Sequence, residues 1–308
     1  MLNILYLVNK KTYLTKMSRV RFHGIESLSK IANVTMYGVG WPSYEEKQSV
    51  DYNIKKLNKK FDIVIAYKPL DLIKFSEINI PKCIRYNEMY DKKWTQKEIL
   101  NSKADLVICH HLNEMKNYNM KNVVFKYIGH CANNTIFKNY NVPKEYDFML
   151  VGCINQHYPL RQKVKKIFEK LKKKGYKCYI HPHPGYNLND AHTNKYMIEM
   201  AKQISKTRIC ITCSGIPKTR FGKYIEIPMC GSAICADIPN DNADDYKYVI
   251  EINTQMNDNE IIDILEKHIK NNELRLDHIK MGLEFSKNYT QEKYAERLLQ
   301  IISNFLNK

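Results

Sequence analysis

Short apolar runs and amphipathic segments alternate along the first half of the chain. Runs rich in β-branched and aromatic residues predict strands at Asn3–Val8, Val34–Tyr37, Ile63–Tyr67, Cys83–Tyr86, Leu106–Cys109 and Val123–Tyr127. Segments with helical spacing lie between them, at residues 19–32, 51–60, 95–102 and 112–118. Short, continuous apolar strands are typical of parallel sheets that helices cover on both faces. The pattern therefore predicts a doubly wound α/β domain.

The alternation stops at residues 133–146, a polar stretch that contains Pro143, and then begins again. Further strands are predicted at Asp147–Gly152, Lys177–His181, Thr207–Thr212, Ala233–Ala236 and Tyr248–Glu251. Helices are predicted at residues 160–174, 194–205, 258–270, 273–286 and 290–306. A chain of 308 residues fits two domains of about 150 residues each. We therefore expect two Rossmann-like α/β domains, residues 1–143 and 144–308, with the C-terminal helix packing back on the first.

Cysteine usage and hydropathy indicate the cellular setting. The nine cysteines are scattered, and most lie in strand-like segments, with a single CxxC formed by Cys210 and Cys213. This distribution favours buried thiols over disulfides or a metal site. No apolar run reaches the roughly 20 residues that a membrane-spanning helix needs, and the N-terminus lacks the features of a signal peptide. The sequence therefore predicts a cytoplasmic protein.

The formal charge of +17 has three interpretations. Its lysines are spread over helices such as residues 161–174, so solvated helix faces explain it without a ligand. Attraction to an anionic substrate is the second explanation, and a peripheral contact with an anionic membrane surface is the third. No nucleic-acid-binding motif accompanies the charge, so nucleic acid is not an expected partner.

The segment from Thr207 to Asp237 carries the densest candidate chemistry. Arg220, Lys223 and Glu226 are spaced three apart, which places them on one face of a helix. Two cations suit a diphosphate and a carboxylate suits a ribose diol. Gly231 and Ser232 form a small-residue turn whose backbone N–H groups could approach phosphate. The alternative is a surface ion-pair face with no ligand.

Other candidates follow the ends of predicted strands, where open α/β sheets bind their ligands. Gly152 ends one strand, and Tyr158 and Arg161 follow it, although Arg161 in a first helical turn could equally be solvated. His181 and His183 follow the next strand and could contact a nucleobase or sugar, or belong to a rigid Pro-rich turn. Two histidines alone do not make a metal site.

The first half offers candidates for acid–base chemistry. Glu88 and Asp91 follow the strand that ends at Tyr86, and His110 follows the strand that ends at Cys109. A carboxylate or imidazole at such a position could remove a proton from an acceptor hydroxyl. Each of them could equally have a structural role.

At these residues the chain resembles the GT-B glycosyltransferases, especially the group related to spore-maturation-type enzymes. The likeness is strongest in FMLVGCINQHYPLR (148–161) and RFGKYIEIPMCGSAICAD (220–237), and KYIGHCANNTIF (126–137) is similar to the group's linker strand. The resemblance implies two Rossmann-like domains facing across a cleft, an acceptor on the first and a nucleotide-sugar donor on the second. It also implies that the ribose meets Glu226, and that the diphosphate meets Arg220 and the turn at Gly231.

The expected activity is transfer of a sugar from a nucleoside-diphosphate sugar to a glycan or other hydroxyl acceptor, lipid-linked acceptors included. No cofactor and no metal are expected, because the resemblance implies that cationic side chains stabilise the leaving diphosphate. Many retaining relatives carry a second glutamate seven residues before the first, where this chain has Thr219, so the stereochemistry is left open. The alternatives are a nucleotide-sugar epimerase of the same fold and a non-enzymatic basic protein that binds nucleic acid or membrane.

Overall fold

The structure is a computed structural model that describes residues 1–15, 19–67, 69–86, 88–185, 188, 190–241 and 245–307. It contains two compact α/β units, each with its own parallel sheet. Unit 1 takes in residues 1–129 and the C-terminal segment from residue 291 onwards. Most of the intervening chain, from His130 to Thr290, forms unit 2.

The sheet of unit 1 has six parallel strands in the order β2-β1-β3-β4-β5-β6. The strands are β1 (Asn3–Leu7), β2 (Asn33–Tyr37), β3 (Ile63–Ala66), β4 (Lys82–Tyr86), β5 (Leu106–Cys109) and β6 (Val124–Tyr127). The helices are α1 (Lys10–Thr15), α2 (Arg19–Leu28), α3 (Val50–Lys56), α4 (Lys92–Ser102), α5 (Leu112–Met115) and α11 (Gln291–Leu306), with short 3-10 turns at Pro69–Asp71 and Phe75–Glu77. The central strands β1, β3, β4 and β5 are almost fully buried, as their apolar sequences predict.

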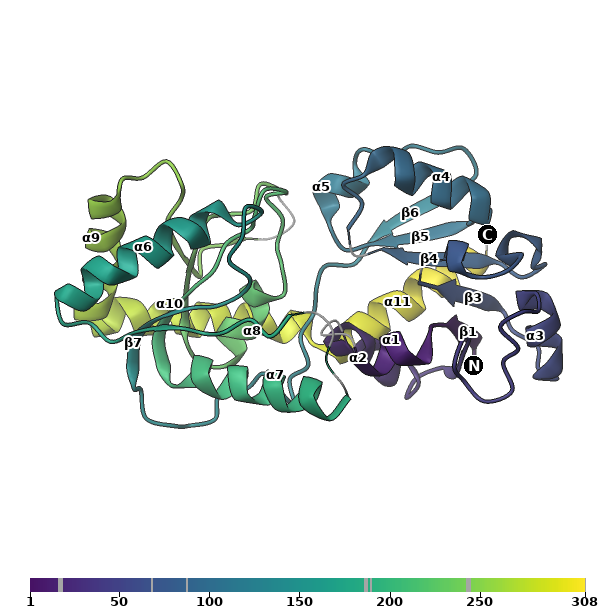
Figure 1. The fold of residues 1–308 in the computed structure, drawn as a ribbon, viewed down its shortest axis with the longest axis horizontal. Coiled ribbons are helices and arrows are strands. Elements are labelled where there is room, and N and C mark those ends of the chain that lie inside the picture. The colour runs from purple at the N-terminus through teal and green to yellow at the C-terminus, as the bar shows by residue number, and fades with distance from the viewer. Residues whose placement is uncertain are drawn as a thin grey trace. The chain divides into compact units, whose positions relative to one another are not determined.

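The C-terminal helix α11 packs against α2 within unit 1 (Figure 1). Gly24 of α2 permits this approach, because a Cβ atom there would lie 2.8 Å from Cδ1 of Tyr294. Tyr294 also accepts a hydrogen bond of 2.8 Å from Nε of the buried Arg85 on β4. The end of the chain is therefore fixed to the core of the unit that the N-terminal half builds.

The sheet of unit 2 has five parallel strands in the order β11-β10-β9-β7-β8. The strands are β7 (Tyr146–Leu150), β8 (Cys178–Ile180), β9 (Thr207–Ile211), β10 (Ala233–Ala236) and β11 (Val249–Glu251). The helices are α6 (Pro159–Lys173), α7 (Asp190–Ser205), α8 (Lys223–Met229), α9 (Asp258–Lys270) and α10 (Asn272–Ser286), followed by a 3-10 turn at Lys287–Tyr289. Aliphatic side chains of β7, β9, α6 and α9 form one continuous core.

Two details differ from the sequence-based expectation. The N-terminal loop contains a short helix, α1, which the apolar pattern did not indicate because only one turn and a half is formed. The first boundary between the units falls at Gly129–His130 and not near residue 143, because residues 130–143 pack within unit 2. Within the described ranges, no helix has both the length and the apolar character to cross a membrane.

Candidate functional site

The order of the strands places a topological switch point in unit 2 between β7 and β9. The chain leaves β7 for β8 on one side of the sheet and then returns to β9 on the other side of β7. All five strands are parallel, so the residues that follow β7, β8, β9 and β10 lie at one edge, which we call the carboxyl edge of unit 2. In open α/β sheets ligands bind outside this edge, at the switch point.

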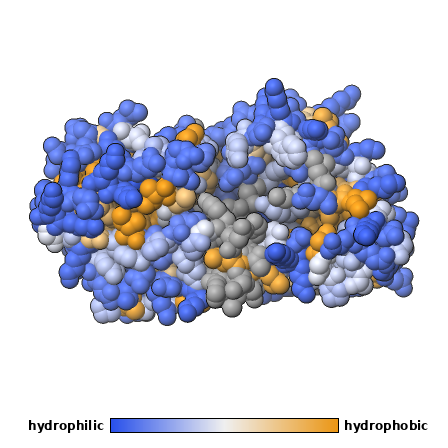
Figure 2. Space-filling view, viewed as in Figure 1, coloured by the Kyte–Doolittle hydropathy of each residue, from blue (hydrophilic) through white to orange (hydrophobic). Residues whose placement is uncertain are grey.

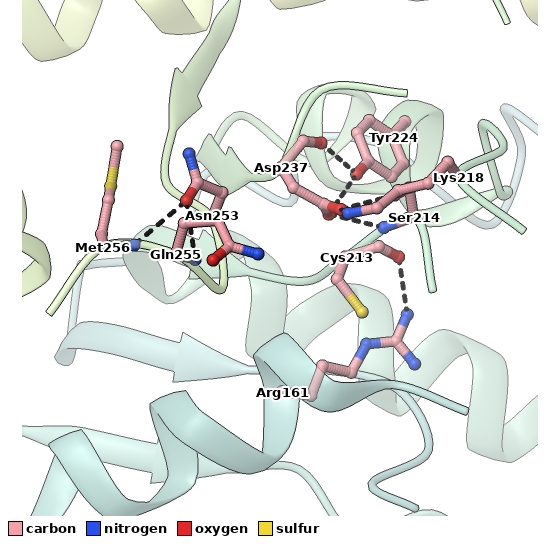
Figure 3. A network of polar contacts seen from close by, with 9 residues as sticks. All are labelled: Arg161, Cys213, Ser214, Lys218, Tyr224, Asp237, Asn253, Gln255 and Met256. Carbon is pink, nitrogen blue, oxygen red and sulfur yellow. Dashed lines mark hydrogen bonds and ion pairs between the residues drawn. The ribbon is translucent and has the colours of Figure 1, made fainter. Parts of the chain in front are cut away.

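Arg161 of α6 lies at this switch point and connects the loops that follow β7 and β9. Its Nη1 donates to the carbonyl oxygen of Cys153 at 3.0 Å. Its Nη2 donates to Oγ1 of Thr212 at 2.9 Å. The same Nη2 donates to the carbonyl oxygen of Cys213 at 3.3 Å (Figure 3). Because the side chain is only 4% exposed, the prediction of a solvated arginine is wrong at this position.

In the described part of the chain, the contacts of Arg161 are with neutral groups. Among the described residues, no carboxylate forms an ion pair with it, and its buried Nε has no hydrogen-bond partner. The ring of Tyr158 faces the guanidinium, with 4.2 Å from Cζ to the ring centre. A buried cation is costly unless an anion accompanies it, so this position favours an anionic ligand.

Gly152 makes room for this guanidinium. A Cβ atom at residue 152 would lie 2.6 Å from Nη1 of Arg161, and the backbone has φ of +106°. The sequence places Gly152 at the end of a predicted strand, where a ligand is expected. The structure gives a more direct reason for a glycine, namely that any side chain would collide with Arg161.

A second network, which the sequence analysis missed, fixes the loop that follows β9 (Figure 3). The buried carboxylate of Asp237, directly after β10, accepts hydrogen bonds from the backbone N–H and hydroxyl of Ser214 at 2.7 and 2.6 Å. It also pairs with Nζ of Lys218 at 2.7 Å, and Tyr224 donates to its carbonyl oxygen at 2.6 Å. An aspartate at the end of a buried strand was the available signal.

Lys223 and Glu226 form an ion pair at the start of α8, with side chains 18% and 8% exposed. The helix begins just after the loop that Asp237 fixes, so this pair also lies towards the carboxyl edge. The spacing of three residues allows the contact, as the sequence predicted for one helix face. Without a ligand, each charge is therefore balanced by the other.

His181 is buried directly after β8, and its Nε2 has no hydrogen-bond partner in the described part of the chain. Burial, and after it the neighbouring charges of Lys223 and of protonated His183, lower the pKa of His181 to about 4. His183, which is half-buried, also has a lowered pKa, because of burial and then of Lys223 and Arg161. These effects show that both rings lie near the cations of the same edge and are neutral at pH 7.

Arg220 has structural contacts within unit 2, and the diphosphate role that the resemblance implies for it stays a prediction. Its side chain is 1% exposed, and its guanidinium stacks on Tyr289, with 4.1 Å from Cζ to the ring centre. Its Nη1 donates to the carbonyl oxygen of His130 at 3.1 Å. His130 begins unit 2 and Tyr289 stands next to its last residue, Thr290. Arg220 thus fastens together the two segments through which the chain enters and leaves unit 2.

Gly231 and Ser232 lie at the opposite edge of the sheet, because they precede β10 while Asp237 follows it. The hydroxyl of Ser232 is buried and donates to the carbonyl oxygen of Thr207, at 2.7 Å. The carbonyl oxygen of Gly231 accepts a hydrogen bond of 2.8 Å from Lys144. The helix α8 runs across the sheet between the two edges, so the structure does not bring these two residues to Lys223. We leave them out of the proposed site.

The three acid–base candidates of unit 1 all follow strands at the carboxyl edge of its sheet. Glu88 is exposed. Asp91 is also exposed, and its Oδ1 accepts a hydrogen bond of 3.0 Å from the backbone N–H of Trp94, so it caps α4. His110 is 2% exposed, with Nδ1 2.7 Å from the carbonyl oxygen of Ile128. Because a carbonyl only accepts, Nδ1 carries a proton, and in the neutral ring Nε2 carries the lone pair.

Unit 1 also contains a contact between a carboxylate and a histidine that the sequence did not predict. Nδ1 of the buried His111 lies 3.0 Å from Oε2 of Glu114, a residue of α5. The same carboxylate accepts a hydrogen bond of 2.5 Å from the backbone N–H of Met89. The spacing of three residues was a weak signal for this contact.

Within the described ranges, no group of three or more His, Cys, Asp or Glu side chains is arranged to hold a metal ion. The nine cysteines are free thiols.

Solved structures share this architecture over nearly the full length. A glycosyltransferase from Rickettsia africae ESF-5 matches with a TM-score of 0.66 and 14% identity, over 99% of this chain and 98% of the other. The chain has the GT-B fold. An alpha-glucosyltransferase in complex with UDP and a 13-mer DNA matches with a TM-score of 0.66 and 12% identity, over 98% and 100%.

Anabaena HepE in complex with UDP-glucose matches this GT-B chain with a TM-score of 0.60 and 8% identity, over 99% of this chain and 100% of the other. No protein-family model and no curated protein matches the sequence. At these identities the likeness establishes the fold and not the activity.

Proposed function

We propose that this chain is a glycosyltransferase that moves a sugar from a nucleoside-diphosphate sugar to a hydroxyl acceptor. The observation that carries the proposal is Arg161, a buried cation without a carboxylate partner among the described residues, at the switch point of a GT-B unit. A diphosphate supplies the missing negative charge, and guanidinium groups bind phosphate oxygens well. Proteins of this fold have been solved with UDP or UDP-glucose.

The remaining groups of the carboxyl edge suit the other parts of the donor. Lys223 is 18% exposed, so its ammonium group could exchange Glu226 for a phosphate oxygen. Glu226 would then accept hydrogen bonds from the ribose hydroxyls. The neutral ring of His181 could donate to or accept from the nucleobase or the sugar. Binding would thus replace one internal ion pair by two contacts with the ligand.

The reaction follows from these roles. The acceptor oxygen attacks the anomeric carbon and forms the new C–O bond, while the bond from that carbon to the diphosphate oxygen breaks and its electron pair leaves with the nucleotide. Arg161 and Lys223 stabilise the negative charge of the leaving group without a metal ion. The acceptor proton passes to a base, for which we propose Nε2 of His110, with Glu88 and Asp91 as the other candidates.

The direct test is donor binding. Thermal unfolding is followed with UDP, GDP and TDP sugars, because a ligand that binds the folded state raises the midpoint. One nucleotide series should stabilise the protein, and Glu226→Gln and Lys223→Met should each weaken that binding by about tenfold or more. The matched control is Lys293→Met or Glu296→Gln, which breaks an ion pair of the same spacing on α11. No response to any nucleotide would overturn the proposal.

A second measurement separates transfer from epimerisation. The protein is incubated with the stabilising donor, with EDTA and without an acceptor, and the sugar nucleotide is analysed. Without an acceptor, a glycosyltransferase leaves the sugar configuration unchanged and releases nucleotide only by slow hydrolysis. Conversion of the sugar to an epimer contradicts the proposal.

A further inference from the structure

The solvent face of α4 in unit 1 combines large apolar side chains with lysines. Trp94 is 53% exposed and Leu100 is 64% exposed, and Lys93 and Lys97 lie between them on the same side of the helix. The opposite side, which includes Ile99, is buried. Tyr90, just before the helix, is 78% exposed. We call Tyr90, Lys93, Trp94, Lys97 and Leu100 the α4 face.

The lysines of this helix differ from two lysines near the end of α6. Lys170 and Lys174, at the end of α6, pair with carboxylates of α9, at 2.8 and 2.6 Å. Among the described residues, no carboxylate forms an ion pair with Lys93 or Lys97. Every large apolar side chain of α6 is buried, so that helix shows an ordinary solvated face. Positive charge and exposed apolar surface coincide on α4.

The position of Tyr90 is fixed by its neighbours. The backbone N–H of Met89 donates to Glu114 at 2.5 Å, and its carbonyl oxygen accepts a hydrogen bond of 2.5 Å from Tyr118. Asp91, on the other side of Tyr90, caps α4. The backbone is therefore held on both sides of Tyr90, while the ring of Tyr90 remains in solvent. In Figure 2 the visible surface is mostly hydrophilic, with apolar groups in several places.

We propose that the α4 face binds the surface of an anionic lipid bilayer. Lysines near such a surface are attracted to acidic headgroups. Tyrosine and tryptophan favour the boundary between headgroups and acyl chains, because each has an apolar body and a polar tip. Leu100 adds aliphatic surface that a bilayer buries and that a nucleic-acid backbone does not. A second copy of the chain would place lysine against lysine, so charge disfavours a symmetric dimer.

The location fits the acceptor side of the proposed reaction. Glu88 and Asp91 lie in the loop between β4 and α4, so the α4 face begins at the carboxyl edge of unit 1. A protein held by this face would present that edge near the bilayer. A lipid-linked acceptor could then reach the site from the bilayer. This inference about the acceptor rests on the proposed function, whereas binding to the bilayer does not.

Sedimentation with vesicles tests the contact. Vesicles of phosphatidylcholine alone are compared with vesicles in which about one lipid in three is the acidic phosphatidylglycerol. The full chain should bind the acidic vesicles, and added salt should weaken the binding. Lys93→Glu with Lys97→Glu should weaken it about tenfold or more. The matched control, Lys165→Glu with Lys166→Glu on α6, changes the charge equally and should leave most of the binding intact.

Tryptophan fluorescence locates the contact. The chain has two tryptophans, so Trp41→Phe leaves Trp94 as the single reporter. Its emission should shift to the blue with acidic vesicles, and Trp94→Ala should weaken sedimentation several-fold. Leu276→Ala removes an exposed apolar group from α10 and serves as the control. Unchanged emission of Trp94, or equal binding by all variants, overturns the proposal.

Two other occupants are distinguished by the same variants. If a DNA duplex, and not the vesicles, binds in a way that depends on Lys93 and Lys97, the face is a nucleic-acid site and the proposal is wrong. If the chain dimerises through Trp94 and ignores vesicles, the face is a protein interface and the proposal is again wrong. Thermal shifts with nucleotide sugars should stay unchanged in the α4 variants, so loss of donor binding and loss of bilayer binding are separate failures.

Discussion

Gly152 and Arg161 are arranged so that the guanidinium occupies the space where a side chain at residue 152 would stand. A Cβ atom there would be 2.6 Å from Nη1, closer than non-bonded atoms approach. The contact joins the end of β7 to the first turn of α6 and allows Arg161 to reach the loop that follows β9. The lack of a side chain at Gly152 therefore allows the guanidinium of Arg161 to lie at the switch point.

The first prediction concerns this contact. Gly152→Ala should lower the free energy of unfolding by about 1–2 kcal/mol for the positive φ and by about 1–3 kcal/mol more for the collision. Gly175→Ala is the matched control, because its φ is +92° and no atom lies within 4 Å of the added Cβ. Urea unfolding of both variants gives the difference. If the two variants lose the same free energy of unfolding, the side chain of Arg161 moves away from the added Cβ atom without cost.

The second prediction concerns the loop between β9 and α8. Asp237→Ala leaves the hydroxyl and N–H of Ser214 without their acceptor and removes the partner of Lys218, so we expect a loss of about 2–3 kcal/mol of stability. Asp245→Ala is the control, because it removes an exposed ion pair with Lys247 and should change stability by less than about 0.5 kcal/mol. If both variants unfold at the same urea concentration, Asp237 does not anchor the loop.

The third prediction separates two roles of Arg220. If its stacking on Tyr289 and its bond to His130 fasten unit 2, Arg220→Lys should lower the free energy of unfolding by about 1 kcal/mol or more. Arg208→Lys is the control, because a lysine can keep the ion pair with Asp147. Both variants are compared by thermal unfolding and by nucleotide binding. Weaker donor binding at unchanged stability would instead favour the diphosphate role that the resemblance implies.

The fourth prediction concerns pH. Because the pKa of His181 falls to about 4 in the folded protein, the unfolded chain binds more protons between that value and about 6.5. Stability should therefore be complete above about pH 6.5 and decrease as the pH falls towards 4, by up to about 3 kcal/mol from this group. His183 and His268 have lowered pKa values as well and act in the same direction.

The contribution of His181 is isolated by comparing the wild type with His181→Gln. Urea unfolding at several pH values from 7 to 4 should show a shallower decrease for the variant. If stability decreases equally with pH in the two proteins, the pKa of His181 is not lowered in the folded chain. That result would contradict the prediction.

The α/β pattern of the sequence was a good guide to the elements. The strand predicted at Leu106–Cys109 and the helix at residues 258–270 have the same bounds in the structure. Apolar runs of four or five residues mark buried parallel strands, and an asparagine followed by a glutamate three residues later marks the start of α9. These are local signals, which sequence carries directly.

The site was predicted less completely, because it depends on distances between segments far apart in the chain. Spacing correctly paired Lys223 with Glu226, since both lie on one helix. The same reasoning grouped Gly231 with them, although α8 carries the chain across the sheet to the other edge. Asp237 and Ser214 are 23 residues apart, and no periodicity joins them.

The sequence alone determined the alternating elements, the two parallel sheets and the strand ends where chemistry belongs, because these follow from local patterns of apolar residues. Only the tertiary structure decided that Arg161 is a buried charge at the switch point, that Arg220 is fastened between two connecting segments, and that the lysines of α4 share their face with exposed Trp94. Burial and charge pairing are properties of the packed chain, and they assign different roles to arginines and lysines that look alike in the sequence.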